Sequence, residues 1–243
     1  MNRLPILAIA VMSASGAAAQ DLDWTYRATM YGWIPGMSTS VETSFGTVET
    51  NPDAGDILSA LDFAFMGSLS AQRGRLGFVG DFLYTDLSTA QDTPLPLYGS
   101  GTVDVQLTAF SGYALYRVTS DPKVNLDLGV GFRTFDIKVG ASVSAGVLPA
   151  QSQSLDASWT DPLIAARLSV PINEDWFMTG FADYGTTGSD SETWQVYAGL
   201  GYKFNEQWST QVGYRYMDIN KEIDGRDVSI ALDGVLFAFS YDF

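Results

Sequence analysis

The sequence has 243 residues and a formal net charge of −15, from 13 basic and 28 acidic residues, and it contains neither cysteine nor histidine. Disulfides, thiolate nucleophiles and histidine-based catalysis are therefore excluded, and the acidic balance excludes the positively charged surface that a nucleic-acid partner requires. We expect no enzymatic activity, because histidine, the commonest general base and metal ligand, is missing.

The first element is an N-terminal export signal. The basic residue Arg3 is followed by an apolar run that ends at Met12 and by small residues up to Ala19, which is the order of a secretory signal peptide. We expect residues 1–19 to be cleaved and residues 20–243 to form one exported domain.

After the signal, apolar residues recur at every second position through most of the chain, which is the periodicity of β strands. The pattern predicts a nearly all-β protein with about ten strands. Eight or twelve strands are also compatible with it, because such boundaries are uncertain by about two to four residues. The predicted strands are 24–34, 63–72, 76–87, 102–117, 124–138, 157–170, 176–185, 193–204, 208–218 and 229–243.

The first long connection contains the only helical pattern. Asp53 and Asp56 have the spacing of an N-cap and a first turn, and Ile57, Leu58 and Leu61 follow as a short apolar stripe. A short helix here has two possible locations in a barrel. It either folds into the mouth of the lumen as a plug or packs on the rim.

The strand faces decide what lies inside a closed barrel, because successive side chains point to opposite sides. Alternate positions in 103–115, 194–204 and 235–243 form apolar faces. In a membrane barrel these faces meet lipid, whereas in a soluble barrel they fill the core. Strand length favours the membrane, since soluble strands average about 5 to 6 residues and tilted membrane strands about 9 to 11.

The membrane arrangement places charged residues of both signs on the lumen faces. They form either a network of ion pairs that fills a narrow barrel or an ion-selective constriction. The small diameter of a ten-strand barrel favours the network, and pairing is expected in both cases because an unpaired buried charge is costly. The lumen charges are Arg27, Asp81, Asp104, Asp127, Arg133, Asp161, Arg167, Asp183, Lys203 and Arg215.

The connections between the predicted strands alternate in length. Short turns lie at 73–75, 119–122, 172–175 and 205–207, and longer loops begin at Pro35, Ser88, Val139, Thr186 and Ile219. This is the layout of an outer-membrane barrel whose termini and short turns face the periplasm.

Aromatic residues gather near both ends of the strands, as expected of the girdles at two membrane interfaces. Trp24, Tyr26, Trp176 and Trp208 lie near the short turns, and Tyr31, Trp33, Tyr84, Trp159, Tyr184 and Trp194 lie near the longer loops.

One acidic segment has part of a calcium-loop pattern. Asn220, Glu222, Asp224 and Gly225 match its early positions, but Ala231 stands where a bidentate glutamate is required. A hairpin tip at Asp224 and Gly225 explains the same residues, so we expect neither a metal nor a cofactor.

Several motifs resemble a known family. The alternating terminal aromatics resemble the C-terminal signature that the bacterial outer-membrane assembly machinery reads, and four further motifs resemble porin-like proteobacterial outer-membrane β-barrel proteins without an assigned activity. The resemblance implies a closed antiparallel up-and-down transmembrane barrel in the outer membrane of a Gram-negative bacterium, with membrane lipids and the assembly machinery as partners. The residues concerned are Phe237, Phe239, Tyr241 and Phe243, and the motifs at 31–35, 159–163, 188–190 and 213–215.

Two functions fit these observations. A porin-like or structural surface protein needs only the fold and its loops, with a lumen that is largely filled and charge-paired. A narrow channel for small solutes or ions needs an open lumen, for which ten strands are marginal. The sequence favours the filled barrel.

Overall fold

The structure is a computed structural model. It describes residues 23–43, 46–92, 98–119, 121, 123–188, 190–223 and 225–243. The expected signal peptide, residues 1–19, lies outside the described residues. Within these ranges no helix is long and apolar enough to cross a membrane.

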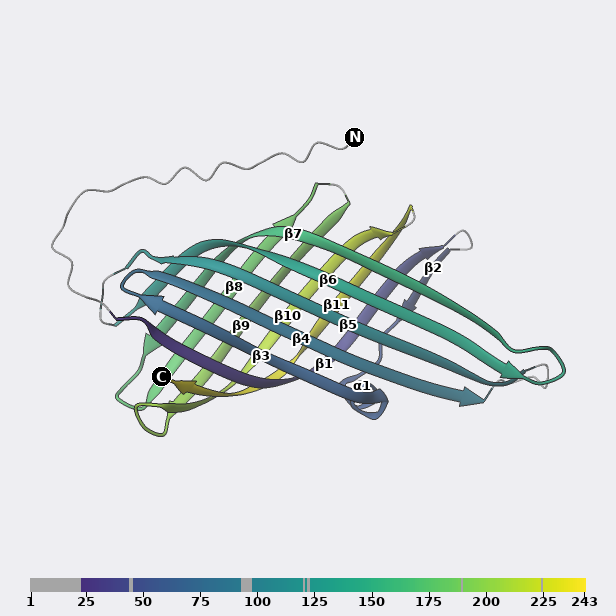
Figure 1. Ribbon diagram of the computed structural model, residues 1–243, viewed down its shortest axis with the longest axis horizontal. Coiled ribbons are helices and arrows are strands. Elements are labelled where there is room, and N and C mark those ends of the chain that lie inside the picture. The colour runs from purple at the N-terminus through teal and green to yellow at the C-terminus, as the bar shows by residue number, and fades with distance from the viewer. Residues whose placement is uncertain are drawn as a thin grey trace.

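The strands form a closed antiparallel barrel (Figure 1). Ten strands follow one another around the wall, and the last pairs with the first from Arg27↔Asp242 to Val41↔Val228. The short β2 adds a hairpin to β1. The predicted barrel of ten strands is therefore confirmed. The strands are β1 (Thr25–Thr43), β2 (Gly46–Thr50), β3 (Leu61–Arg73), β4 (Leu76–Asp92), β5 (Tyr98–Arg117), β6 (Asn125–Ala145), β7 (Gln151–Pro171), β8 (Trp176–Thr186), β9 (Ser191–Lys203), β10 (Trp208–Ile223) and β11 (Arg226–Asp242).

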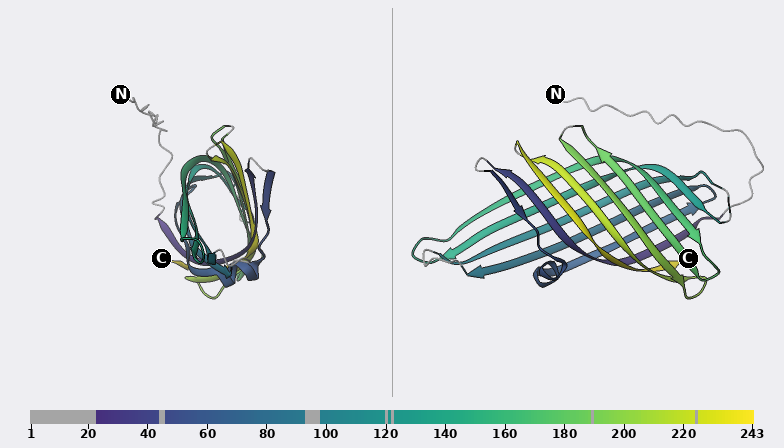
Figure 2. Two further views of the ribbon diagram at one scale, coloured as in Figure 1. Left: turned by 90° about the vertical axis from the view of Figure 1, so that its right-hand side faces the viewer. Right: turned by 180° about the vertical axis from the view of Figure 1, so that it is seen from behind.

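The two ends of the barrel differ. One end carries the tight connections, such as the turn at Gly74, where a positive φ of 57° suits glycine, and both ends of the described chain meet there through the bonds between Tyr26 and Phe243. We call this the turn end. The opposite end, called the loop end, carries long strand extensions, seen on β4 to β7 in Figure 2.

Most of the predicted long loops are paired strand. The ladder of β5 and β6 continues to Tyr98↔Ala145, and that of β6 and β7 continues to Val143↔Gln151. A 21-residue strand at about 3.3 Å per residue and a tilt of about 40° rises about 50 Å, whereas the apolar band of a membrane barrel is about 25 Å tall. The loop-end parts of β6 and β7 therefore stand clear of that band.

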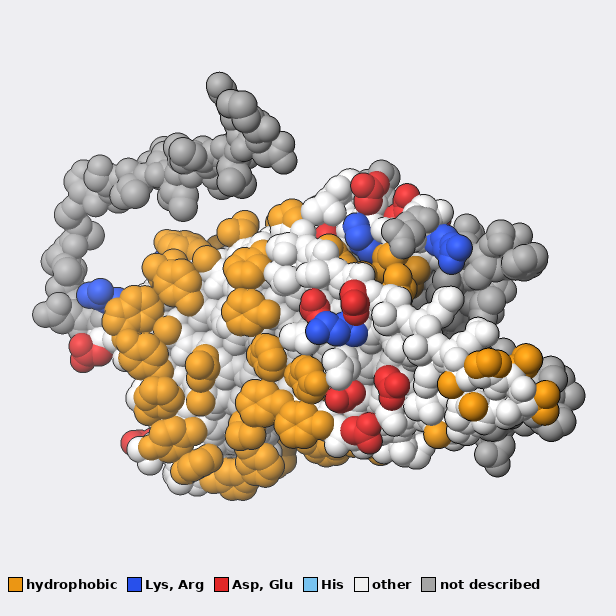
Figure 3. Space-filling model, turned by 45° about the vertical axis from the view of Figure 1, so that its right-hand side comes forward, with side chains coloured by type: hydrophobic (Ala, Val, Ile, Leu, Met, Phe, Trp, Pro, Cys, Tyr) orange, Lys and Arg blue, Asp and Glu red, His pale blue; other side chains and the backbone are white. Residues whose placement is uncertain are grey.

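The outer face of the long strands changes from apolar near the turn end to polar near the loop end. On β6, Val130 and Phe132 are exposed on the outside, and Arg133 is buried inside. Beyond this level the outer face carries Asp136 and Lys138. Lipid requires an apolar outer face, and water requires a polar one. Figure 3 shows hydrophobic side chains gathered over one half of the surface and charged side chains over the other.

The structure reverses the predicted inner and outer faces of β5. Tyr113 and Leu115, assigned to lipid, are buried inside the barrel, and Phe110 and Tyr116 are exposed outside. Asp104 shares the outer face with Phe110, so its predicted place in the lumen is wrong. The error has a physical cause: the inner face of β5 is itself largely apolar, and a rule that sends apolar faces to lipid inverts the strand.

Three residues of the predicted outer girdle also point inward. Trp33 is buried, and Tyr31 and Trp159 pack against the same interior cluster. Trp176 and Trp208, predicted for the other girdle, are exposed on the outside of the turn end as expected. Inward aromatics near the predicted loops fill the lumen instead of marking an interface.

The predicted helix is confirmed as α1 (Ala54–Ala60). The Asp53 side chain accepts from the amides of Gly55 and Asp56, and the Asp56 side chain accepts from the Asp53 amide, which forms a capping box. No residue of α1 is buried, and the segment before it bonds to β1 through Met37 N–H and the Pro52 carbonyl. The helix lies on the rim and is not a plug.

One proline lies inside a long strand, at a position where only one neighbouring strand pairs. Pro162 opposes Phe132 of β6, and the β7–β8 ladder begins one residue later, at Leu163↔Gly185. Pro35 lies in the same way beyond the last β1–β3 pair, Met30↔Gly67. Each proline therefore lacks a donor where one neighbouring ladder is absent.

We predict that a charge on the outer face is costly on one half of β6 and harmless on the other. Val130→Arg should destabilise the barrel by about 2 to 4 kcal/mol, because it places a cation near the bilayer midplane. Ser142→Arg, on the same face beyond the apolar band, should stay within about 0.5 kcal/mol. Unfolding titrations in lipid vesicles measure both, and equal costs would contradict the assigned band.

Candidate functional site

The lumen is filled by successive layers of side chains. A cavity of about 560 Å³ opens at the turn end, and its inner end is formed by Tyr31, Asp81, Tyr113, Gln195 and Arg215. We call it the turn-end cavity. Beyond it lie a buried polar network and then an apolar layer.

The turn-end cluster combines two arginines with one carboxylate. Arg117 Nε lies 2.9 Å from Asp127 Oδ1, and Arg167 Nη2 lies 2.7 Å from Asp127 Oδ2. Arg167 also donates to Gln72 Oε1 at 3.2 Å. These side chains come from β3, β5, β6 and β7, so the cluster joins four strands across the lumen wall.

A second ion pair stands at the mouth of the same cavity. Arg27 donates through Nε and Nη2 to the two carboxylate oxygens of Asp242, at 2.7 and 2.9 Å. The side chains are 39% and 36% exposed, so water screens the pair. The pair lies on β1 and β11 and holds the barrel seam.

The central network begins with a fully buried ion pair. Arg133 Nη2 lies 2.6 Å from Asp183 Oδ2, and both side chains are 0% exposed. Arg133 also donates to Ser111 Oγ, Thr193 Oγ1 and the Tyr113 hydroxyl oxygen. Burial of this pair is tolerated because the guanidinium has several partners besides the carboxylate.

The network continues from Asp183 to the far wall. Gln195 Nε2 donates to Asp183 Oδ2 at 2.5 Å, and Gln195 Oε1 accepts from Arg215 Nε at 2.8 Å. The Arg215 guanidinium lies 4.7 Å from the ring centroid of Trp33. The amide of Gln195 therefore bridges two charged residues that do not touch.

Arg215 reaches its carboxylate partner mainly through a tyrosine. Tyr31 accepts from Arg215 Nη1 at 3.3 Å and donates to Asp81 at 3.0 Å, while the direct Arg215–Asp81 approach is 3.9 Å. Together with the bonds above, the central network ties β1, β4, β5, β6, β8, β9 and β10.

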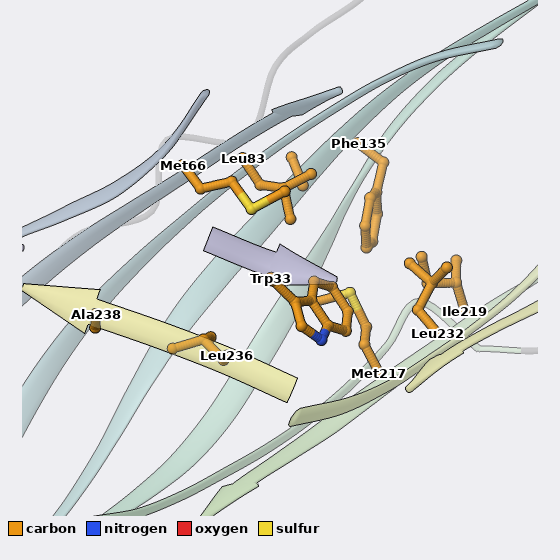
Figure 4. Packing of buried hydrophobic residues seen from close by; sticks show 10 residues of the cluster. Trp33, Met66, Leu83, Phe135, Met217, Ile219, Leu232, Leu236 and Ala238 are labelled. Atoms are coloured by element: carbon orange, nitrogen blue, oxygen red, sulfur yellow. The ribbon is translucent and has the colours of Figure 1, made fainter. Parts of the chain in front are cut away.

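An apolar layer lies beyond the network, and Figure 4 shows its side chains. Phe135 is fully buried, and Trp33 and Met217 lie side by side in the same cluster. These side chains come from β1, β3, β4, β5, β6, β10 and β11 and meet inside the barrel. The buried members are Trp33, Met66, Leu83, Ala109, Phe135, Met217, Ile219, Leu232, Leu236 and Ala238.

One predicted lumen charge is buried without a cation. Asp161 accepts from Trp159 Nε1 at 3.0 Å, from Ser191 Oγ at 2.9 Å and from Thr187 Oγ1 at 3.2 Å. Arg133 is its partner across the strands, yet the guanidinium turns to Asp183. Three donors thus replace a salt bridge and tie β7 to the β8–β9 connection.

The structure brings most of the predicted charges inside. Asp81, Arg133, Asp183 and Arg215 join the central network, while Arg27, Asp127 and Arg167 line the turn-end cavity. Asp161 lies apart, and Asp104 lies outside. No group of three or more potential metal-binding residues occurs among the described residues.

Sequence reasoning missed several partners of these charges. Arg117 shares its face with Tyr113, so a correct face for β5 would have placed both in the lumen. Asp242 lies on the small-residue face of the last strand, opposite Arg27. No sequence signal marks Gln195 as the bridge between the two buried arginines.

We predict that Arg133→Leu destabilises the barrel by about 3 to 5 kcal/mol, because it leaves the Asp183 carboxylate buried and unpaired. Arg27→Leu is the matched control. It breaks a half-exposed pair and should cost no more than about 1 kcal/mol. Unfolding titrations in detergent micelles measure both, and a small loss for Arg133→Leu would show that its site is hydrated.

Several solved structures resemble this chain, and one of them, with a TM-score of 0.63, supports the architecture. The outer membrane protease OmpT from Escherichia coli superposes with a TM-score of 0.63 at 12% identity, covering 93% of this chain and 99% of that one. Ail, the attachment invasion locus protein of Yersinia pestis, gives a TM-score of 0.39 at 13% identity, covering 90% and 98%. The toluene transporter TodX of P. putida gives 0.38 at 10%, covering 92% and 90%.

No protein of curated function matches the sequence. The family model described as "Outer membrane protein beta-barrel domain" matches residues 4–243, almost the whole chain. The chain therefore belongs to the outer-membrane β-barrel protein family.

Proposed function

We propose that this protein is a non-conducting outer-membrane barrel with a structural or surface role. The observation that carries the proposal is the fully buried level at which Arg133 and Asp183 pair and Phe135 packs above them. A conducting pore needs a continuous hydrated path, and side chains that exclude water from this level interrupt it.

The alternative function is a narrow channel for small solutes or ions. The turn-end cavity favours it, since its volume of about 560 Å³ lies inside the barrel and many of its lining side chains are polar. The cavity ends, however, at Tyr31, Asp81 and Arg215, which are linked by hydrogen bonds and backed by Trp33. Opening a path would break this network and the apolar layer together.

We further propose that the barrel is not an enzyme, although its structural neighbour OmpT is a protease. The likeness at 12% identity extends to the fold. The sequence has no histidine to act as a general base and no cysteine to act as a nucleophile. Both oxygens of the buried Asp161 carboxylate and Oδ2 of Asp183 are occupied by internal donors.

The surface role rests on the loop half of the barrel. With the termini and tight turns in the periplasm, β4 to β7 extend away from the cell, as the alternating connections predict. Their outer face is polar there, with Asp136 and Lys138 on β6 and Asp156 on β7. A tall polar wall suits contact with the medium or with neighbouring surface molecules.

Export and assembly are part of the same proposal. Residues 1–19 serve as the cleaved signal peptide, and the outer face of β11 serves as the signature for the assembly machinery. Phe237, Phe239 and Phe243 are exposed on that face, and Tyr241 packs against Trp208. This aromatic row also meets the membrane lipids.

We predict that the refolded protein produces no stable conductance steps in planar lipid bilayers. The physical reason is the buried level at Arg133 and Phe135, which holds no water-filled path. Co-flotation with lipid vesicles verifies that the same preparation is inserted. Reproducible single-channel steps from inserted protein would overturn the proposal in favour of the narrow channel.

We predict that Phe243→Asp prevents accumulation in the outer membrane of intact cells, because it alters the terminal signature. Phe204→Asp is the matched control, since Phe204 is equally exposed on the outside of the turn end but lies outside the last strand. A charge near the interface costs only about 0 to 1 kcal/mol, so the control should accumulate. Normal amounts of Phe243→Asp, measured in membrane fractions, would contradict the assigned signature.

A further inference from the structure

The turn-end cavity concentrates positive charge in an acidic protein. Five of the 13 basic residues line it, against three of the 28 acidic residues, so its lining carries a formal charge of 5 − 3 = +2 while the chain carries −15. The charged lining residues are Arg27, Arg117, Arg167, Lys203, Arg215, Asp81, Asp127 and Asp242.

The two excess positive charges of the cavity lining can be assigned to particular residues. Arg27 is neutralised by Asp242 at the mouth, and Arg215 is neutralised by Asp81 at the inner end. Arg117 and Arg167 share Asp127, which leaves one positive charge between them. Lys203 supplies the second, since its ammonium has no acidic partner within the described part of the chain.

The turn-end cluster presents its arginines to the cavity. The Asp127 side chain is only 4% exposed, whereas Arg117 and Arg167 are 28% and 24% exposed. Asp127 therefore holds the two guanidiniums from behind. Each guanidinium has five N–H donors, and the bonds to Asp127 and Gln72 leave donors of both free to bind.

These observations point to an oxyanion as ligand. Two guanidiniums fixed side by side match the geometry of a carboxylate or phosphate, and they are held in place before the ligand arrives. The rest of the lining offers hydroxyl and amide groups, among them Thr29, Ser70 and Gln211. A hydroxylated or otherwise polar body would find partners there.

We propose that the turn-end cavity binds a small soluble oxyanion, a carboxylate or a phosphate, between Arg117 and Arg167, with Lys203 at the rim. The cavity volume of about 560 Å³ is that of a small-molecule site. The barrel wall separates the cavity from lipid headgroups, so the ligand enters from the aqueous side at the turn end. The buried network blocks the inner end of the cavity, so the site binds the anion but does not transport it.

Binding of inorganic phosphate and of citrate to the folded protein tests the proposal. Calorimetric titrations of the full mature chain in nonionic detergent, at a fixed ionic strength set with chloride, should show saturable binding of at least one of the two probes. Arg117→Gln should weaken that binding about tenfold, the loss expected for one charge-assisted hydrogen bond. Asp127 keeps Arg167 as its partner, so the variant retains a paired carboxylate.

Arg226→Gln is the matched control, because it removes the same charge at the loop end, far from the cavity, and it should leave the affinity within about twofold. Lys203→Gln should weaken binding less than Arg117→Gln, since an ammonium at the rim is more hydrated. Absence of saturable binding of both probes by folded wild-type protein would overturn the proposal. Equal weakening by Arg226→Gln and Arg117→Gln would also overturn it, because net charge and not the cavity would then hold the anion.

Discussion

Each long strand of this barrel meets two solvents, and the rest of the structure follows from that change. Near the turn end the outer face touches lipid, so Val130 and Phe132 face outward and the polar residues turn inside. Beyond the apolar band the outer face touches water, so Asp136 and Lys138 face outward and apolar residues fill the interior. The apolar interior cluster around Phe135 therefore lies near the level where the outer surface changes from apolar to polar.

The meeting of the two regimes explains where the lumen closes. At that level Arg133 and Asp183 are buried under Phe135, and Arg215 lies over Trp33. A buried arginine is tolerated only with enough acceptors, and the amide of Gln195 and the hydroxyl of Tyr31 supply them between the charged groups. The network thus connects most of the strands, and the apolar layer shields it from water at the loop end.

The period-two pattern predicted about ten strands, and the spacing of Asp53 and Asp56 predicted the capped helix, because strand alternation and a capping box are local features. The alternating connection lengths and the family resemblance predicted the closed barrel. The faces of β5 were not predictable in this way, since Tyr113 and Leu115 are inward residues with the character of outward ones. Of the predicted lumen charges, Asp104 was placed on the wrong side for this reason. The partners of Arg133 and Arg215 could not be read from sequence, because strands far apart in the chain meet across the lumen.

In the proposed function, closure in the middle gives the barrel two separate aqueous faces. The turn-end cavity, with Arg117 and Arg167 on one carboxylate, is accessible only from the side of the tight turns. The polar wall of β4 to β7 is accessible only from the other side. In the non-conducting barrel that we propose, the network between them leaves a ligand in the cavity no hydrated route to the loop end. The side chains that block conduction in this proposal also separate the chemistry of the two ends.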